Sequence, residues 1–422
     1  MTYKELARTL PSWVFAIGML GASLYAQAVE ITITCGPSGS DVEFCLKHAQ
    51  AWAAKTGNTI KNFSPPNSPT EKLALYRQLF AAKSSDIDVV QIDTVWPGLL
   101  KDHLADLKPY SQGVESQHFP AIIANNSVNG KLLGMPWYTD AGLLYYRTDL
   151  LKKYGLRVPQ TWEELTQTAL KVQTGERAKG DTDFHGFVFQ AKAYEGLTCN
   201  AIEWVGGQGG GTVVNADGEI TIRNAQAAKA LNLAASWIGS ISPAGVLNYE
   251  EEEARGVFQN ANALFMRNWP YAWALMQKND SLVKGKVGVA KLPGNPSAAA
   301  LGGWQLGVSK YSKHPAIAAD LVMYMTSAAV QKTRAIHGSY NPTLPALYKD
   351  KEVLEANEFM GALAEVFANS VARPTTATGL KYPQVSQSFW NAAHEVMSKR
   401  ATGEEAVTKL ESRLKQIRRK HW

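Results

Sequence analysis

Several motifs that mark metal proteins and common hydrolases are absent from this 422-residue sequence. Its three cysteines form no Cys-x-x-Cys or Cys/His cluster, which argues against a structural zinc site. It contains no Gly-x-Ser-x-Gly elbow and no His-Glu-x-x-His motif, and the glycine-rich segment 206–211 lacks the Gly-Lys-Ser/Thr of a phosphate-binding loop. The sequence therefore predicts no metal and no cofactor.

A strong excess of one charge is also missing. There are 43 basic and 37 acidic residues, which gives a net charge of +6 that is spread along the chain. The one cationic run, 413–421, falls on a predicted C-terminal helix and is typical of a solvated helix face. We therefore expect no nucleic-acid partner.

Only the first residues hold a long apolar run, Trp13–Tyr25. Lys4 and Arg8 precede this run and Ala26-Gln27-Ala28 follows it, which is the pattern of a secretory signal peptide. The alternative is an uncleaved membrane anchor, but the run is short for a membrane span. We expect residues 1–28 to be a signal peptide cleaved after Ala28, and the protein to be exported to the periplasm.

In such an oxidising compartment, two of the three cysteines can form a disulfide bond. Cys35 and Cys45 bracket a short Gly/Ser/Pro loop and are favoured over any pair with Cys199. The sequence leaves open whether that bond forms.

Strand and helix patterns alternate at short spacing in the first hundred residues, which predicts a mostly parallel, doubly wound sheet. From Pro315 onward the pattern is mostly helical. We therefore predict an α/β protein with two lobes and a helical tail. The predicted early elements are strands at Ile31–Thr34, Asn58–Phe63 and Asp88–Asp93, and helices at Asp41–Thr56, at Thr70–Lys83 and from Thr94 to His103.

Two later segments bear on function. Tyr138–Tyr146 reads as one strand with a polar start. The apolar run Ala263–Met266 predicts another strand, and Pro270 predicts a helix opening just after it. Trp269 and Tyr271 then lie where a strand ends and a helix begins, which in α/β proteins is the edge that binds ligands.

Aromatic rings, carboxylates and one arginine recur in the predicted bends. Rings bury the flat C–H faces of a sugar, while carboxylates and a guanidinium hydrogen-bond its hydroxyls. Glycines 302 and 303 permit a close backbone approach. The residues concerned are Tyr138, Trp269, Tyr271, Trp304, Asp41, Glu43, Asp93, Asp140 and Arg373.

Structural roles compete with binding at several of these positions. Asp93 is placed to cap a following helix, Asp140 to pair with Arg147, and Arg373 to form a surface ion pair. The aromatic rings are alternatively core residues, and Trp273 is better suited to anchoring its helix than to ligand binding. Glu195 and Glu203 fall on a predicted helix and are expected to be solvated.

Six motifs in order along the chain carry a family resemblance: SSDIDV at 84–89, DAGLLYYR at 140–147, YEGL at 194–197, NWPYAW at 268–273, KGKVGVA at 284–290 and LGGW at 301–304. With them the sequence resembles the extracellular solute-binding proteins of carbohydrate ABC importers, most of all the trehalose/maltose-binding proteins. The resemblance implies a two-lobed Venus-flytrap fold related to maltose-binding protein. Its lobes are expected at 29–138 plus 304–330 and at 139–303 plus 331–422.

The resemblance also implies a set of sugar contacts in the cleft between the lobes. The family's acidic contact at the start of the first helix corresponds to Asp41, where the family more often has Glu, with Glu43 two residues on. Lys72 is the nearest candidate for a basic contact in the second helix. The matching contact positions are Asp93, Tyr138, Asp140, Trp269, Tyr271, Gly303, Trp304 and Arg373.

We therefore expect a monomeric receptor, not an enzyme, that binds an α-glucoside disaccharide such as trehalose or maltose and delivers it to the transmembrane subunits of an ABC permease. The alternatives are the same role for sucrose or another glucoside, a binding protein for another ligand class such as a peptide or a polyamine, and a periplasmic glycoside hydrolase that uses paired carboxylates.

Overall fold

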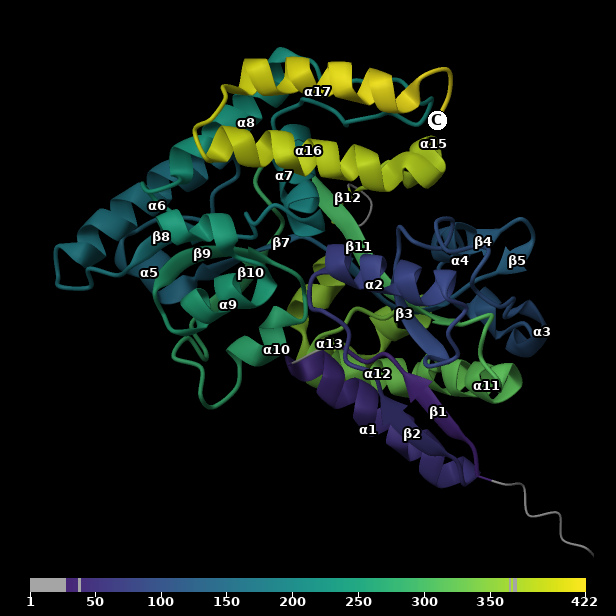
Figure 1. The fold of residues 1–422 in the computed structure, drawn as a ribbon. Coiled ribbons are helices and arrows are strands. Elements are labelled where there is room, and N and C mark those ends of the chain that lie inside the picture. Colours follow the sequence, from purple (N-terminus) through teal and green to yellow (C-terminus); the bar gives the residue numbers. More distant parts are fainter. Residues whose placement is uncertain (1–27, 37–38, 364–365, 367–369) are drawn as a thin grey trace, which may run out of the picture.

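The computed structural model describes residues 28–36, 39–363, 366 and 370–422 (Figure 1). The predicted signal peptide and its charges lie outside the described residues, apart from Ala28. None of the helices in this described part combines the length and the hydropathy needed to cross a membrane.

A six-stranded sheet organises the first lobe. Its order is β12-β11-β3-β1-β2, and β6 pairs with β11. β1 is parallel to β2 and β3, but β11 runs antiparallel to β3 and β6, so the sheet is mixed rather than mostly parallel. The strands are β1 Glu30–Ile33, β2 Thr59–Asn62, β3 Val89–Asp93, β6 Met135–Ala141, β11 Ala299–Val308 and β12 Ser370–Val371.

Helices cover this sheet and supply the rest of its core. Trp52 packs with strand residues on one side of the sheet, and Tyr76 and Phe80 pack with strand residues on the other side. All three side chains are at most 2% exposed. These helices are α1 Gly39–Thr56, α2 Pro69–Ala81 and α11 Pro315–Met325. The small outer elements are α3 Lys108–Ser111, α4 Pro120–Asn126 and the hairpin of β4 Ser127–Val128 and β5 Lys131–Leu132.

A four-stranded sheet with the order β10-β7-β9-β8 organises the second lobe. Its core holds an aromatic cluster in which Trp204 and Trp237 have ring centroids 5.7 Å apart. The strands are β7 Leu143–Arg147, β8 His185–Val188, β9 Ala263–Asn268 and β10 Val287–Ala290. The helices are α5 Thr148–Lys153, α6 Trp162–Arg177, α7 Glu195–Gly207, α8 Ala225–Trp237, α9 Glu251–Gln259 and α10 Ala272–Met276.

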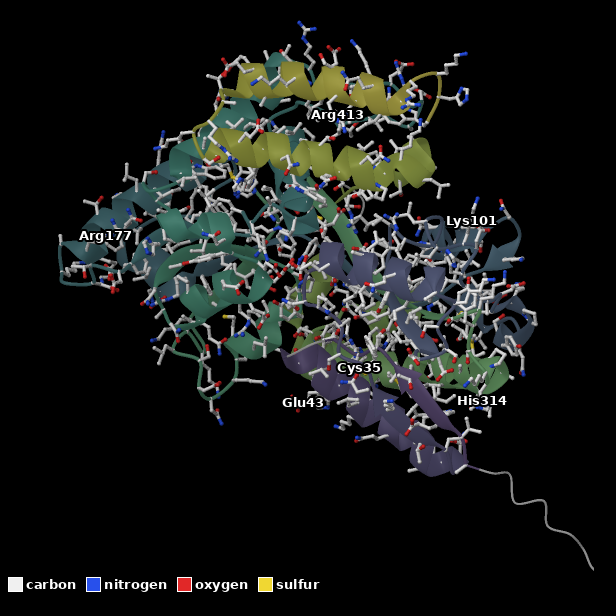
Figure 2. All side chains as sticks on the ribbon, in the orientation of Figure 1. Cys35, Glu43, Lys101, Arg177, His314 and Arg413 are labelled. Atoms are coloured by element: carbon white, nitrogen blue, oxygen red, sulfur yellow. A yellow bond between two sulfur atoms is a disulfide. The ribbon has the colours of Figure 1, made fainter. Side chains whose placement is uncertain are left out.

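The C-terminal region is helical, as predicted. α16 packs on α7 and α17 packs on α8, so the tail covers the second lobe (Figure 1). Arg413 lies on the exposed face of α17, as predicted for the cationic run (Figure 2). The helices are α12 Ala328–Gly338, α13 Lys351–Ala356, α15 Thr375–Thr378, α16 Tyr382–Met397 and α17 Gly403–Arg418.

The chain leaves the first sheet for the second at Gly142. The prediction of a single strand at Tyr138–Tyr146 is therefore wrong, because β6 ends at Ala141 and β7 of the other sheet begins at Leu143. A Cβ at position 142 would lie 2.0 Å from the Glu203 Oε1 atom, so only glycine fits at this crossing. β6 and β11 thus form the connection between lobes.

The helix predicted from Thr94 to His103 is also wrong. This segment is a series of turns. Pro97 and Gly98 lie within it, and proline both lacks an N–H and disfavours the helical conformation of the residue before it.

Candidate functional site

A cavity of about 1000 Å³, its open mouth included, lies between the two sheets. Nine of the ten predicted binding residues line it, although they come from six separate segments of the chain. Lys72 also lines it. The lining residues are Gly36, Ser40, Asp41, Asn67, Pro69, Lys72, Gln91, Asp93, Tyr138, Asp140, Glu195, Gly196, Cys199, Glu251, Glu252, Trp269, Tyr271, Gly302, Gly303, Trp304, Tyr340 and Arg373.

Glu43 is the predicted residue that does not line the cavity. It is exposed on α1, at the outside of the molecule (Figure 2). Residues two apart on a helix point about 200° apart, so a helix that turns Asp41 toward the cavity turns Glu43 away from it.

Trp269 and Tyr271 form one wall, and two glutamates of α9 hold them. The Trp269 indole N–H donates to Glu251 Oε1 at 3.2 Å, and the Tyr271 hydroxyl donates to Glu252 Oε1 at 2.6 Å. Burial raises the pKa of the Glu251 carboxyl. Glu250, the residue before these two glutamates, caps the start of α9 in a capping box with Glu253.

Trp304 lies on another wall, beside Lys72. The Lys72 Nζ atom is 4.3 Å from the Trp304 ring centroid and donates to Gln91 Oε1 at 3.1 Å. Burial lowers the pKa of Lys72 to about 8. Gln91 was missed by the sequence analysis, although its position two residues before Asp93 on one strand places both side chains on the same face.

Asp41 is fixed at the start of α1 by two donors. Gln91 Nε2 donates to its Oδ2 at 3.0 Å, and Arg334 Nη2 donates to its Oδ1 at 2.9 Å. The Arg334 guanidinium lies 4.0 Å from the Trp137 ring and 4.2 Å from the Tyr340 ring. Nothing in the sequence around Arg334 indicated this role, because it depends on packing α12 against α1.

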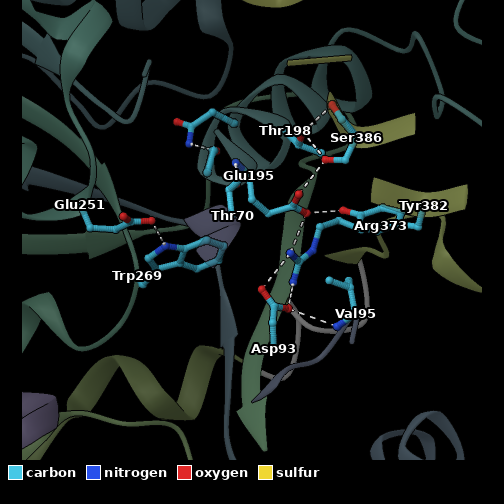
Figure 3. A network of polar contacts seen from close by, with 12 residues as sticks. Thr70, Asp93, Val95, Glu195, Thr198, Glu251, Trp269, Arg373, Tyr382 and Ser386 are labelled. Carbon is cyan, nitrogen blue, oxygen red and sulfur yellow. Dashed lines mark hydrogen bonds and ion pairs between the residues drawn. The ribbon is translucent and has the colours of Figure 1, made fainter. Parts of the chain in front are cut away.

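Arg373 sits at the floor of the cavity between two carboxylates (Figure 3). It donates to both oxygens of Asp93, at 2.6 and 3.2 Å, and to Glu195 Oε1 at 2.9 Å. Arg373 is 5% exposed, so the surface ion pair is excluded. Asp93 also accepts from the Val95 N–H at 3.1 Å, so it caps the turn after β3 as well as binding Arg373.

The expectation that Glu195 and Glu203 are solvated is wrong. Both are buried on α7, where they bind arginines. Glu195 also accepts from the hydroxyls of Tyr382 and Ser386. Burial raises the pKa of both carboxyls.

Asp140 differs from the other acids of the cavity. Its side chain is 7% exposed, and within the described residues no group donates a hydrogen bond to it. The predicted alternative of pairing with Arg147 is wrong, because Arg147 binds Asp149 at 2.8 and 2.7 Å. Burial, and then the Asp41 carboxylate, raise the pKa of Asp140 to about 7. Asp140 is therefore an acceptor ready for a ligand hydroxyl.

The two glycines of β11 are required by protein packing. A Cβ at Gly302 would lie 3.1 Å from Cζ3 of Trp269. Gly303 has φ +128°, and a Cβ there would lie 2.7 Å from the Tyr138 carbonyl oxygen. They let Trp269 of one lobe and the backbone of β6 approach the strand that carries Trp304.

The fold and this site define a ligand receptor with an interlobe cleft, lined by rings and hydrogen-bonding side chains. Residues 45–332 match the model of the bacterial extracellular solute-binding protein family, and the chain belongs to that family. It is thus the substrate-binding component of an ABC transporter.

Individual relatives agree with this assignment. The chain is 52% identical over 406 residues to a Deinococcus radiodurans protein described as "Probable ABC transporter-binding protein", covering 95% of this chain and 96% of the relative. The structure of maltose-bound T. maritima MalE3 is similar with a TM-score of 0.87 and 38% identity, over 92% of this chain and 100% of that one. A Thermotoga lettingae solute-binding protein bound to α-D-tagatose shares the fold, with a TM-score of 0.82 and 23% identity over 92% of this chain and 100% of that one.

Proposed function

We propose that this protein is the periplasmic receptor of an ABC sugar importer and that it binds an α-glucoside disaccharide, trehalose or maltose. The observation that carries the proposal is the lining of one interlobe cavity by Trp269, Tyr271 and Trp304 together with the carboxyl of Asp140, which has no donor among the residues that the structure describes.

The chemistry of the cavity supports a sugar as the ligand. Most of its carboxyls already accept hydrogen bonds from protein groups, which holds acceptors in fixed positions beside ring faces. Hydroxyls suit such acceptors, and C–H faces suit rings. The likeness to MalE3, solved with maltose, supports an α-linked glucose disaccharide.

In this proposal the binding site comprises Asp41, Asp93, Tyr138, Asp140, Trp269, Tyr271, Gly303, Trp304 and Arg373, with Lys72. Ligand binding draws together the two lobes, one built on the six-stranded sheet and the other on the four-stranded sheet. The ligand favours the closed state because it contacts both lobes. The mature monomer begins after Ala28 and delivers the sugar to the permease subunits without making or breaking a bond.

Calorimetry on the purified mature protein tests the ligand class. The panel is trehalose, maltose, sucrose, D-tagatose and a mixture of amino acids, with X-ray scattering on each sample to follow closure. We expect heat and a smaller radius of gyration with trehalose or maltose. Binding of tagatose alone overturns the disaccharide assignment, and binding of sucrose alone narrows the assignment to sucrose. Binding of amino acids alone overturns the sugar proposal.

Incubating the protein with trehalose and with maltose, and assaying free glucose, tests the hydrolase alternative. We expect no glucose above the level of a heat-denatured control. Steady release of glucose would replace the receptor proposal with a glycoside hydrolase.

A further inference from the structure

A buried ion pair lies behind the aromatic wall of the cavity. Arg267, on β9, and Glu203, on α7, are both 0% exposed. The Arg267 Nε atom donates to Glu203 Oε2 at 2.8 Å, and Nη2 donates to Oε1 at 2.5 Å. Neither residue lines the cavity.

Stability alone does not account for this pair. Removing two charges from water costs about as much free energy as their attraction returns, and apolar side chains of similar volume often serve as well. The pair is therefore better explained by a geometric task that only a planar, charged group performs.

The position of the ion pair relative to Trp269 indicates what that task is. The Arg267 guanidinium carbon is 3.9 Å from the centroid of the Trp269 ring, which places the cation over one ring face. The indole N–H is held by Glu251, as Figure 3 shows, and Gly302 admits the far edge of the ring. With these three contacts the ring has one orientation, in which it still lines the cavity.

Glu203 ties the same assembly to the strand that crosses between the lobes. Its Oε1 atom accepts from the Ala300 N–H at 3.0 Å, two residues before Gly302 on β11. Gly142, at the other crossing, has no room for a Cβ because Glu203 and Arg267 fill that space. The ion pair thus joins β9, α7 and β11 directly behind the ligand wall.

We propose that Arg267 is a positioning residue for ligand binding: its guanidinium, held by Glu203, fixes the Trp269 ring in the orientation that receives the sugar. The sugar in this statement rests on the proposed function. A ring that is already immobile loses no freedom when the ligand stacks on it, and this preorganisation raises affinity.

Arg267→Lys is the informative variant. Lysine keeps a positive charge for Glu203 but lacks the plane that stacks on an indole. Arg147→Lys is the matched control, since Arg147 is a buried arginine on β7 of the same sheet, paired with Asp149 and outside the cavity lining.

Two readouts separate ring placement from sugar binding. The first is ¹⁹F NMR of protein labelled with 5-fluorotryptophan, in which Trp269→Phe assigns the Trp269 resonance. The second is calorimetry with maltose and trehalose. We expect Arg267→Lys to shift or broaden the Trp269 resonance in the ligand-free protein and to weaken sugar binding about tenfold. We expect Arg147→Lys to change neither.

An unchanged Trp269 resonance in Arg267→Lys overturns the inference whether or not sugar binds. A changed resonance with full affinity also overturns it. Equal losses of affinity in both arginine variants show a general effect of destabilisation and overturn it too. If the parent protein binds no sugar, the proposed function fails, while the resonance still decides whether Arg267 orients the ring. Should Arg267→Lys fail to fold, Glu203→Gln, which retains the shape and an acceptor for Ala300, takes its place with the same expected outcomes.

Discussion

The Arg373 guanidinium binds both oxygens of the Asp93 carboxylate at 2.6 and 3.2 Å, across a sequence separation of 280 residues. Asp93 ends β3 of the first lobe, and Glu195, the second acid on Arg373, begins α7 over the other sheet. The floor of the cavity is therefore an ionic junction between the lobes.

Asp93→Asn is expected to weaken both binding and folding. It leaves the buried Arg373 with one charged partner, and breaking such a pair costs about 3 kcal/mol of stability. Sugar affinity should fall at least tenfold because Arg373 and residue 93 no longer hold their places. Urea denaturation and calorimetry measure the two effects.

Asp88→Asn is the control for that substitution. Asp88 is a buried acid just before the same strand, bound to the Thr32 N–H and the Ser312 hydroxyl, and it does not line the cavity. The Asp88→Asn variant should be less stable than the parent protein but bind the sugar with unchanged affinity. A similar loss of affinity in both variants would mean that stability, not the ionic junction, sets binding.

Trp269→Ala is expected to remove most sugar binding and leave the fold intact. Stacking covers about 100 Å² of apolar surface, which at about 25 cal/mol/Å² is worth about 2.5 kcal/mol, or roughly 70-fold in affinity. Trp273→Ala is the control, because Trp273 follows on α10 and packs against Phe359. Calorimetry with circular dichroism compares them; unaltered affinity in Trp269→Ala would return Trp269 to a packing role.

Asp140 predicts a pH dependence of binding. Its pKa of about 7 means that it is mostly protonated at pH 6 and mostly ionised at pH 8. Sugar hydroxyls donate more strongly to the ionised carboxylate. We expect affinity about tenfold higher at pH 8 than at pH 6, and we expect this rise to be absent in Asp140→Asn, in which Lys72, with a pKa of about 8, is the cavity group left to titrate above pH 7. A profile of the same slope in Asp140→Asn would assign the titration to another group.

The same carboxyl acts on stability with the opposite sign. Its folded-state pKa lies above the unfolded value of about 3.9. Its contribution is therefore fully present below about pH 4 and is lost as pH rises toward 7. The ligand-free Asp140→Asn variant should lack this loss, which melting temperatures at pH 5 and pH 7.5 measure. If the parent and the variant change equally over this range, Asp140 does not titrate there.

The disulfide between Cys35 and Cys45 confirms the favoured pairing and connects stability with the site. It joins the end of β1 to α1, and Gly36, Ser40 and Asp41 between the two cysteines line the cavity. Replacing both cysteines by serine should cost about 3 kcal/mol in unfolding free energy and also weaken sugar binding.

Cys199→Ser is the comparison for the disulfide, since Cys199 is a free cysteine in the same cavity. Dithiothreitol should reproduce the double-serine phenotype in the parent and in Cys199→Ser. Full affinity after reduction would show that α1 holds Asp41 without the bond.

Local pattern was sufficient for most of the early elements and for nine of the residues that line the cavity. Apolar periodicity, caps and prolines predicted β1, α1, β2, α2 and β3, and the strand-to-helix edge at Trp269, because these signals lie within a few residues of each other. The motifs predicted the two-lobed class. The prediction of one strand through Gly142 was wrong, because a continuous apolar run does not show where the chain passes from one sheet to another.

Which side chains pair with each other was decided only by the tertiary structure. Glu195 and Glu203 look like solvated helix residues, yet α16 packs on their helix. Arg373, just after β12, donates to Glu195, and Arg267 of β9 donates to Glu203. Glu43 and Asp41 are both acids at one helix start, and only the packing of α1 selects Asp41 for the cavity. The sequence by itself determined which residue types are present that suit the proposed sugar ligand. The crossing of β6 and β11 between the lobes decided which of these residues lie together, because contacts between residues hundreds of positions apart depend on how the whole chain folds.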